Sequence, residues 1–154
     1  EAVPDDRKFR LYIETISQLK GPEGRYVRWT DVRLLRRMVR DAQHRGYSPE
    51  RTILHWHYVR RSELKHIIPY QGQADVQVNG YLPYELPFLK LHLHRHFEPF
   101  LARWREDGKR LDGYIRARRV ERLLDAVADV EDDELVPATS LLREFIGGSV
   151  YDLH

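Results

Sequence analysis

The stretch ADVQVN, residues 74–79, decides the fold, because its alternating β-branched positions predict a β-strand. A first strand is predicted earlier, over KFRLYI at residues 8–13, and we expect this apolar run to be buried on both faces. Two helical patterns separate the strands, and this order predicts a parallel pair joined by a right-handed crossover. We therefore expect an α/β protein, helix-rich, whose two strands form one end of a larger parallel sheet.

The first helix lies in TDVRLLRRMVRDAQHRG, residues 30–46. We expect it to start at Thr30 or Asp31, with Thr30 as its cap, and to stop at Gly46. Helical spacing gives it an apolar stripe and a basic stripe. The apolar stripe is Leu34, Leu35, Met38, Val39 and Ala42, and the basic stripe is Arg33, Arg37, Arg40 and His44.

The remaining elements follow from turn residues and periodicity. Residues 20–25 form a Gly- and Pro-rich loop. Ser48 is expected to cap a second helix with Pro49 in its first turn, and that helix is expected to break near Arg61-Ser62. Further helices are predicted over residues 83–104 and 113–128, followed by an acidic turn at 131–134 and an apolar tail, TSLLREFIGG, at 139–148.

Composition excludes several classes of function. The 154 residues contain no cysteine, which removes disulfide and thiolate chemistry. No apolar run is long enough for a membrane span, and no signal peptide is visible, so we expect a cytoplasmic protein. The chain begins Glu1-Ala2 and its one methionine is Met38, from which we expect a piece of a longer protein.

Charge is distributed unevenly along this near-neutral chain, whose formal net charge is +2. Residues 25–65 carry eleven Lys or Arg against four acids, whereas residues 106–134 carry ten acids against six bases. A local excess of positive charge favours a specific anion site over a general polyanion surface. From composition alone, the basic stripe is equally an ordinary solvated helix face.

Four segments together resemble the uridine kinase and phosphoribulokinase group of P-loop kinases, and most closely its bacterial uridine-kinase-like members. They are TDVRLLRRMVRDAQHRGYSPE (30–50), VRRSELKHIIPYQGQADVQVN (59–79), PYELPFLK (83–90) and TSLLREFIGG (139–148). The resemblance covers most of residues 8–90 and 137–149, and it does not extend to residues 91–136.

The resemblance implies that residues 1–154 are a single partial domain, the C-terminal half of a P-loop kinase fold. Its lid would span about residues 20–66, and its C-terminal helical part about residues 83–154. The phosphate-cradling motif G-x-x-x-x-G-K-[ST] is absent from this chain. ATP and Mg²⁺ are therefore expected in the complete kinase and not tightly bound to this chain alone, which we expect to be inactive.

The resemblance also suggests roles for particular residues. Arg37 and Arg40 match family arginines at the transferring phosphates and are the predicted catalytic residues, while Arg33 and Arg45 complete the predicted phosphate-binding set. Asn79 begins a segment that approaches the adenine base in the family. Forked guanidinium donors suit phosphate oxygens, and phosphoryl transfer depends mainly on positioning and charge stabilisation.

The family comparison also implies partners, which are a nucleotide, a nucleoside-type acceptor, an N-terminal P-loop half and a second copy of the chain, with no membrane. Tyr47 and His55 stand where many nucleoside kinases have Arg and Gln near the nucleoside, so the acceptor stays open. A non-catalytic module that binds nucleotide, RNA or a partner protein is the alternative.

Two further groups have open interpretations. Arg60, Arg61 and Lys65 either extend the basic site or lie on the surface, and the surface is the preferred interpretation. His92, His94 and His96 suggest zinc, but no carboxylate or cysteine is placed in sequence to complete a four-ligand site, so no metal is predicted.

Overall fold

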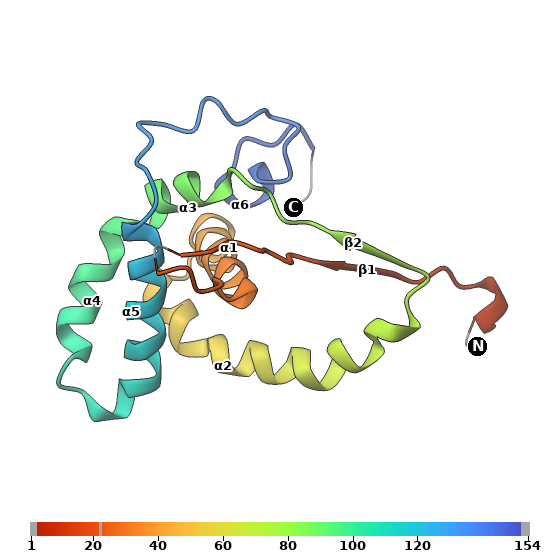
Figure 1. The fold of residues 1–154 in the computed structure, drawn as a ribbon, viewed down its shortest axis with the longest axis horizontal. Coiled ribbons are helices and arrows are strands. Elements are labelled where there is room, and N and C mark those ends of the chain that lie inside the picture. The colour runs from red at the N-terminus through yellow and green to blue at the C-terminus, as the bar shows by residue number, and fades with distance from the viewer. Residues whose placement is uncertain (1–2, 22, 152–154) are drawn as a thin grey trace.

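The computed structural model describes residues 3–21 and 23–151. Two short parallel strands and a helical body make up the molecule (Figure 1). The main elements are β1 (Leu11–Glu14), α1 (Trp29–His44), α2 (Pro49–His66), β2 (Val76–Asn79), α3 (Glu85–Leu93), α4 (Phe97–Trp104), α5 (Leu111–Asp125) and α6 (Arg143–Ile146). Short 3₁₀ turns lie at Asp5–Arg7, Ile68–Gln73, His94–His96 and Gly108–Arg110.

The strands β1 and β2 pair in parallel, as the sequence predicts, with Leu11 opposite Val76 and Ile13 opposite Val78. These four apolar residues share one face of the sheet, because registered residues in a parallel pair point the same way. The prediction that the first strand is buried on both faces is wrong: Leu11 is 52% and Ile13 60% exposed. Val76 and Val78 are also exposed, so this apolar face is largely open to solvent in the described part of the chain.

The α1 helix forms the centre of the core and packs against α2, α3 and α6 (Figure 1). Four residues of the predicted apolar stripe are buried, namely Leu34, Leu35, Met38 and Val39. The fifth, Ala42, lies in the last turn of the helix and is exposed. The helix begins at Trp29, one or two residues earlier than predicted, so Thr30 lies inside the helix and does not cap it.

The predicted start of the α2 helix is confirmed, and its predicted break is wrong. The Ser48 hydroxyl accepts a hydrogen bond from the backbone N–H of Arg51, and Pro49 occupies the first turn. No break occurs at Arg61-Ser62, and the helix continues to His66. Its buried residues include Ile53 and Trp56 near the body, while its distal half runs alongside the strands (Figure 1).

The C-terminal part is helical, as expected, with different boundaries. The predicted helix over 83–104 is interrupted at His94–His96, and α5 spans 111–125 instead of 113–128. The α4 and α5 helices pack side by side and bury Phe97, Trp104 and Leu124. None of the helices in the described ranges is long and apolar enough to cross a membrane.

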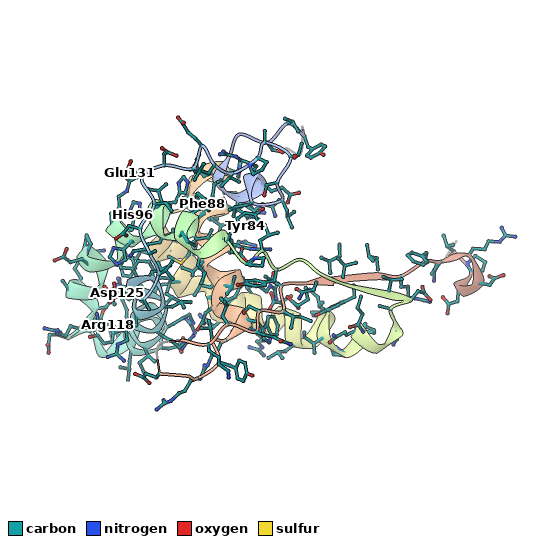
Figure 2. The ribbon with its side chains drawn as sticks, turned by 45° about the horizontal axis from the view of Figure 1, so that its top comes forward. Tyr84, Phe88, His96, Arg118, Asp125 and Glu131 are labelled. Carbon is teal, nitrogen blue, oxygen red and sulfur yellow. The ribbon has the colours of Figure 1, made fainter. Side chains whose placement is uncertain are left out.

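The C-terminal tail returns to the helical body. Tyr84 packs edge-on against Phe88 of α3, and its hydroxyl lies 2.9 Å from the Ser140 hydroxyl (Figure 2). The tail then forms α6, whose Ile146 is buried against α1. Gly147 ends this helix with φ +91°, a backbone conformation that favours glycine.

Candidate functional site

Three of the predicted phosphate-binding residues meet at a cleft of about 590 Å³, which we call the arginine cleft. It lies between α1, α2, α6 and the residue that follows β1. Its lining comprises Thr15, Arg33, Arg36, Arg37, Arg40, Trp56, Tyr58, Val59, Ser62, Glu63, Ile67 and Phe145. The structure therefore brings Arg33, Arg37 and Arg40 together, and it places Arg45 and Asn79 outside this lining.

Arg33 is held by two buried carboxylates. Its Nε lies 3.2 Å from Glu14 at the end of β1, and its Nη2 lies 2.5 Å from Glu63 of α2. The guanidinium also packs over the Trp29 ring. Glu14 in addition accepts a 2.6 Å hydrogen bond from the Tyr12 hydroxyl, and burial together with this bond raises the pKa of Tyr12 to about 12. The charge of Arg33 is thus compensated within the protein.

Arg36 is a core residue and not part of an exposed basic face. Its side chain is 7% exposed, and its Nε pairs with the fully buried Glu85. The same guanidinium donates to the Gly80 carbonyl at 2.8 Å and to the Thr15 hydroxyl at 3.3 Å. These bonds join α1 to the ends of both strands and to the start of α3, so Arg36 organises the floor of the cleft.

Arg37 and Arg45 share one buried acid, Asp41. Arg37 donates to it at 2.9 Å and Arg45 at 2.8 Å, and the Thr52 hydroxyl of α2 adds a third bond at 3.0 Å. Both guanidinium groups remain partly exposed. Asp41 therefore fixes the position of each guanidinium group, and each keeps further N–H donors that face solvent. Arg45 lies about one helical turn beyond the cleft.

Arg40 differs from the other arginines of α1. Within residues 3–21 and 23–151 its side chain makes no ion pair or hydrogen bond, although it lines the cleft and is only partly exposed. A half-buried cation without a carboxylate loses solvation and gains no internal compensation. Among the residues predicted to contact phosphate, Arg40 is the one whose positive charge no carboxylate of the described residues compensates. A bound anion could therefore compensate it.

Asn79 has a structural role at the end of β2. Its side-chain oxygen accepts from the backbone N–H groups of Ile16 and Tyr81, both at 3.0 Å, and its amide donates to the Ile16 carbonyl at 3.1 Å. The two bonds to Ile16 fasten the strands where they leave the sheet, and the bond from Tyr81 fixes the turn that follows β2. The amide keeps one hydrogen for another partner, so the predicted base contact would have to use that single donor.

The acids that organise this site were missed by sequence reasoning. Asp41 lies four residues after Arg37 and four before Arg45, a spacing from which helical ion pairs could have been predicted. Glu14, Glu63 and Glu85 gave no comparable signal, because they reach α1 from other elements. Because these acids pair with the arginines, the net positive charge at the arginine cleft is smaller than the count of Lys and Arg in residues 25–65 suggests.

The three histidines do not gather around a common point. His92 pairs with Asp133 at 3.1 Å, and His94 pairs with Asp125 at 2.7 Å. The loop that carries Glu131 passes the segment that carries His96 (Figure 2). Among the described residues, no group of three or more His, Cys, Asp or Glu is placed to hold a metal ion. His92 instead attaches the acidic turn to α3, and His94 attaches the end of α5 to the turn that follows α3.

Comparisons with protein-family models, with curated proteins and with solved structures return no match to this chain.

Proposed function

We propose that this chain is the lid-containing C-terminal portion of an ATP-dependent, uridine-kinase-like kinase, which transfers the γ-phosphoryl group to a nucleoside or a related hydroxyl compound. One observation carries the proposal. The arginine cleft opens beside Thr15, the residue directly after β1, and ligands of parallel α/β sheets bind outside the carboxyl ends of the strands. The reaction, phosphoryl transfer from ATP, is proposed from the four sequence segments that resemble this kinase group.

The uncovered sheet supports the partial-domain part of the proposal. Parallel sheets are normally covered by helices on both faces. Here Leu11, Ile13, Val76 and Val78 form an apolar face that is between 41% and 60% exposed. Further strands and helices from a P-loop half would bury this face and complete the nucleotide site.

Within such a site, each residue has a distinct task. ATP with Mg²⁺ would supply the phosphoryl group, and the P-loop half would hold its phosphates. Arg40 would stabilise negative charge on the transferring group, because it has no internal acid. Arg37, positioned by Asp41, would direct its remaining donors to the same oxygens, whereas Arg33 and Arg36 would keep the cleft rigid through their carboxylate partners.

A non-catalytic binding module is the second candidate function. It is favoured by the absence of a P-loop and by the internal pairing of Arg33, Arg37 and Arg45. The coding sequence upstream separates the candidates: an in-frame P-loop favours the kinase, and a start codon immediately before Glu1 favours the module.

The decisive experiment is a panel of nucleosides and related hydroxyl compounds, incubated with ATP and Mg²⁺ and the protein extended by its P-loop half. We expect ATP-dependent phosphorylation of at least one acceptor. The isolated chain serves as the matched control and should give no product above the blank. Product from the isolated chain, or none from the extended protein with any acceptor, would reject the kinase proposal.

A further inference from the structure

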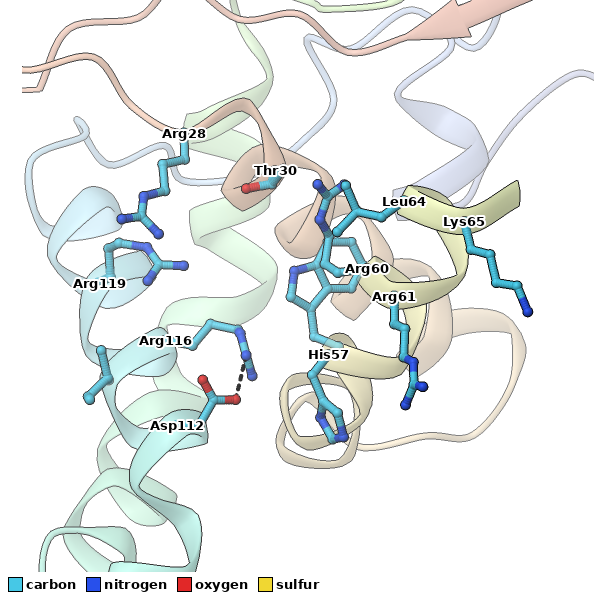
Figure 3. A pocket seen from close by; sticks show the side chains of 12 residues that line it. Arg28, Thr30, His57, Arg60, Arg61, Leu64, Lys65, Asp112, Arg116 and Arg119 are labelled. Carbon is cyan, nitrogen blue, oxygen red and sulfur yellow. Dashed lines mark hydrogen bonds and ion pairs between the residues drawn. The ribbon is translucent and has the colours of Figure 1, made fainter. Parts of the chain in front are cut away.

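A second and larger cleft, of about 810 Å³, lies away from the arginine cleft and shares only Trp56 with it. We call it the lateral cleft. The start of α1, the second half of α2 and the first turns of α5 form it (Figure 3). Arg119 of α5 makes two 2.7 Å bonds to the buried Asp31 of α1, and Arg116 donates to the Ile53 carbonyl of α2 at 3.0 Å. These contacts fix α5 against α1 and α2, so the cleft has a defined shape.

The lateral cleft offers apolar surface on two of its walls. Leu64 of α2 is 58% exposed and Ile115 of α5 is 55% exposed, and both side chains line the cleft. An apolar side chain that enters the cleft would remove part of this surface from water, and the burial of apolar area is favourable. The cleft is therefore suited to receive an apolar side chain.

Positive charge is spread around the rim of this cleft. Arg61 and Lys65 extend from α2 away from Arg28 and Arg119, which lie together on the other side (Figure 3). In the part of the chain that the structure describes, the side chains of Arg28, Arg61 and Lys65 make no ion pair or hydrogen bond, and all three are exposed. Charges this far apart do not enclose one small ion, but they complement an extended acidic surface.

The acidic loop, residues 129–136, has the complementary features. The Val136 N–H donates to the Asp133 carbonyl at 3.0 Å and closes a turn that has Glu134 and Leu135 at its tip. The Arg143 guanidinium donates to the carbonyls of Asp133 and Val136 at 2.7 and 2.8 Å, which fixes the turn. Leu135 is 84% exposed, more than any other large apolar side chain of the described residues. The loop thus presents a leucine on a preformed turn.

Three acids lie beside this leucine, namely Glu131, Asp132 and Glu134. All three are exposed, and within residues 3–21 and 23–151 none of them makes an ion pair. Asp132 only accepts a hydrogen bond from the backbone N–H of Glu134, at 2.9 Å. The tip of the acidic loop therefore combines an apolar side chain with uncompensated negative charge, the reverse of the charge around the lateral cleft.

One copy of the chain does not place its acidic loop in its own cleft. The first turns of α5 form a wall of the cleft, and the loop follows the last turn of this 15-residue helix, which is about 22 Å long. Figure 1 shows the loop passing over α3 and α6. Asp133 holds it there through His92 of α3 and Arg143 next to it in space. Only a loop from another copy is free to approach the cleft.

We propose that the lateral cleft of one copy receives the acidic loop of a second copy. Leu135 enters the cleft beside its two apolar side chains, and the three acids meet the unpaired cations at the rim. Because the two surfaces are different, the contact is head-to-tail and joins copies into rings or open chains. It is independent of the proposed kinase activity, since neither surface includes Arg33, Arg37 or Arg40.

The test measures the weight-average mass of the chain by sedimentation at concentrations up to about 100 µM, which covers weak interfaces. Every sample carries Ile13→Lys, which removes association through the open sheet face, and this reference chain is compared with its variants. We expect its mass to rise with concentration at low salt. The mass should return toward that of a monomer at about 1 M salt, where charges are screened over about 3 Å. Leu135→Ser should weaken the association at low salt.

A charge-swap pair makes the test specific to these two surfaces. The loop variant combines Glu131→Lys with Glu134→Lys, and the cleft variant combines Arg61→Glu with Lys65→Glu. Each variant should stay monomeric by itself, because its loop and its cleft then carry charge of the same sign. An equimolar mixture of the two variants should associate again, because each supplies the charge that the other lacks.

The matched control is Glu98→Lys combined with Glu106→Lys. It changes the net charge as the loop variant does, at exposed positions outside both surfaces, and should associate as the reference chain does. All substituted side chains of the charge-swap pair are exposed, so melting temperatures should not change. A reference chain that stays monomeric at low salt would overturn the proposal and leave the cleft to a different acidic partner. Association of either swapped variant alone, or a mixture that stays monomeric, would overturn it equally.

Discussion

The Arg36 guanidinium pairs inside the protein with the Glu85 carboxylate, 49 positions away in the sequence. Burial raises the pKa of Glu85, and the hydrogen bond and charge of Arg36 oppose that rise. The pair links α1, the ends of the strands and α3 through one guanidinium. It shows that a basic run on a helix can be structural even when its neighbours are candidates for ligand binding.

Replacement of this arginine should destabilise the fold. Arg36→Met leaves Glu85 buried without its partner, which typically costs about 3–5 kcal/mol. Urea unfolding of the variant against the unaltered chain measures the loss. In the double variant with Glu85→Met, most of the stability should return, because no unpaired charge remains. A single variant as stable as the parent would contradict the buried pair.

Leu35 should contribute through packing alone. It is fully buried in the core beside α3 and α6, so Leu35→Ala should lower the free energy of unfolding by about 2–5 kcal/mol. Leu135 is 84% exposed and supplies the control, for which Leu135→Ala should change stability by no more than about 0.5 kcal/mol. Equal effects of the two substitutions would show that α1 is not central to the core.

Arg40 should affect turnover and leave stability unchanged. In the protein extended by its P-loop half, Arg40→Ala should lower kcat by about one order of magnitude or more, as expected when a charge at the transferring phosphoryl group is lost. The isolated domain should keep its melting temperature, since Arg40 has no internal partner in the described residues. Unchanged kcat would assign the arginine cleft a purely structural role.

Arg37→Ala should also lower kcat by a similar factor. A control variant is needed, because the lower kcat could come from the lost charge or from a displaced Asp41. The substitution removes one of three hydrogen bonds to Asp41, so a small stability loss is expected as well. Thr52→Val removes another bond to the same acid without removing a charge. If Thr52→Val lowers kcat as much as Arg37→Ala, then the position of Asp41 matters and the Arg37 charge does not.

The uncovered sheet should drive self-association of the isolated chain. Unpaired edge groups and an apolar face made by Leu11, Ile13, Val76 and Val78 favour contact with a second copy. We expect a dimer or larger species in light scattering at concentrations of tens of micromolar, roughly the range in which complexes with weak to moderate interfaces form. Ile13→Lys should shift the population toward monomer, and a monodisperse monomer before substitution would refute the expectation.

Acid should loosen the loop at residues 129–136. Burial alone would raise the pKa of Asp133, but hydrogen bonds from Arg143 and His92 outweigh it and lower the pKa below its usual value. A carboxyl group whose pKa is lowered in the folded state stabilises the fold above its unfolded pKa, near 3.9, and loses this contribution as pH falls further. The stability difference between the parent and Asp133→Asn should therefore shrink below about pH 4. A difference that stays constant with pH would exclude this linkage.

The sequence by itself determined the parallel strand pair, the helix-rich α/β character, the cap at Ser48 and the buried apolar stripe of α1. Each of these depends on local periodicity or on residues a few positions apart. The geometry of a helix or strand places such residues on one face or in one turn. It also indicated the arginines that line one cleft, because residues at helical spacing lie on one side.

Only the tertiary structure decided what each arginine contacts. Arg33, Arg36 and Arg37 look alike in sequence, yet one meets Glu14 and Glu63, one is buried on Glu85, and one shares Asp41. The lateral cleft likewise exists only because α5 packs across α1 and α2. Such charge pairing depends on elements brought together from distant positions in the chain, and electrostatic compensation acts over a few ångströms of space regardless of separation in sequence.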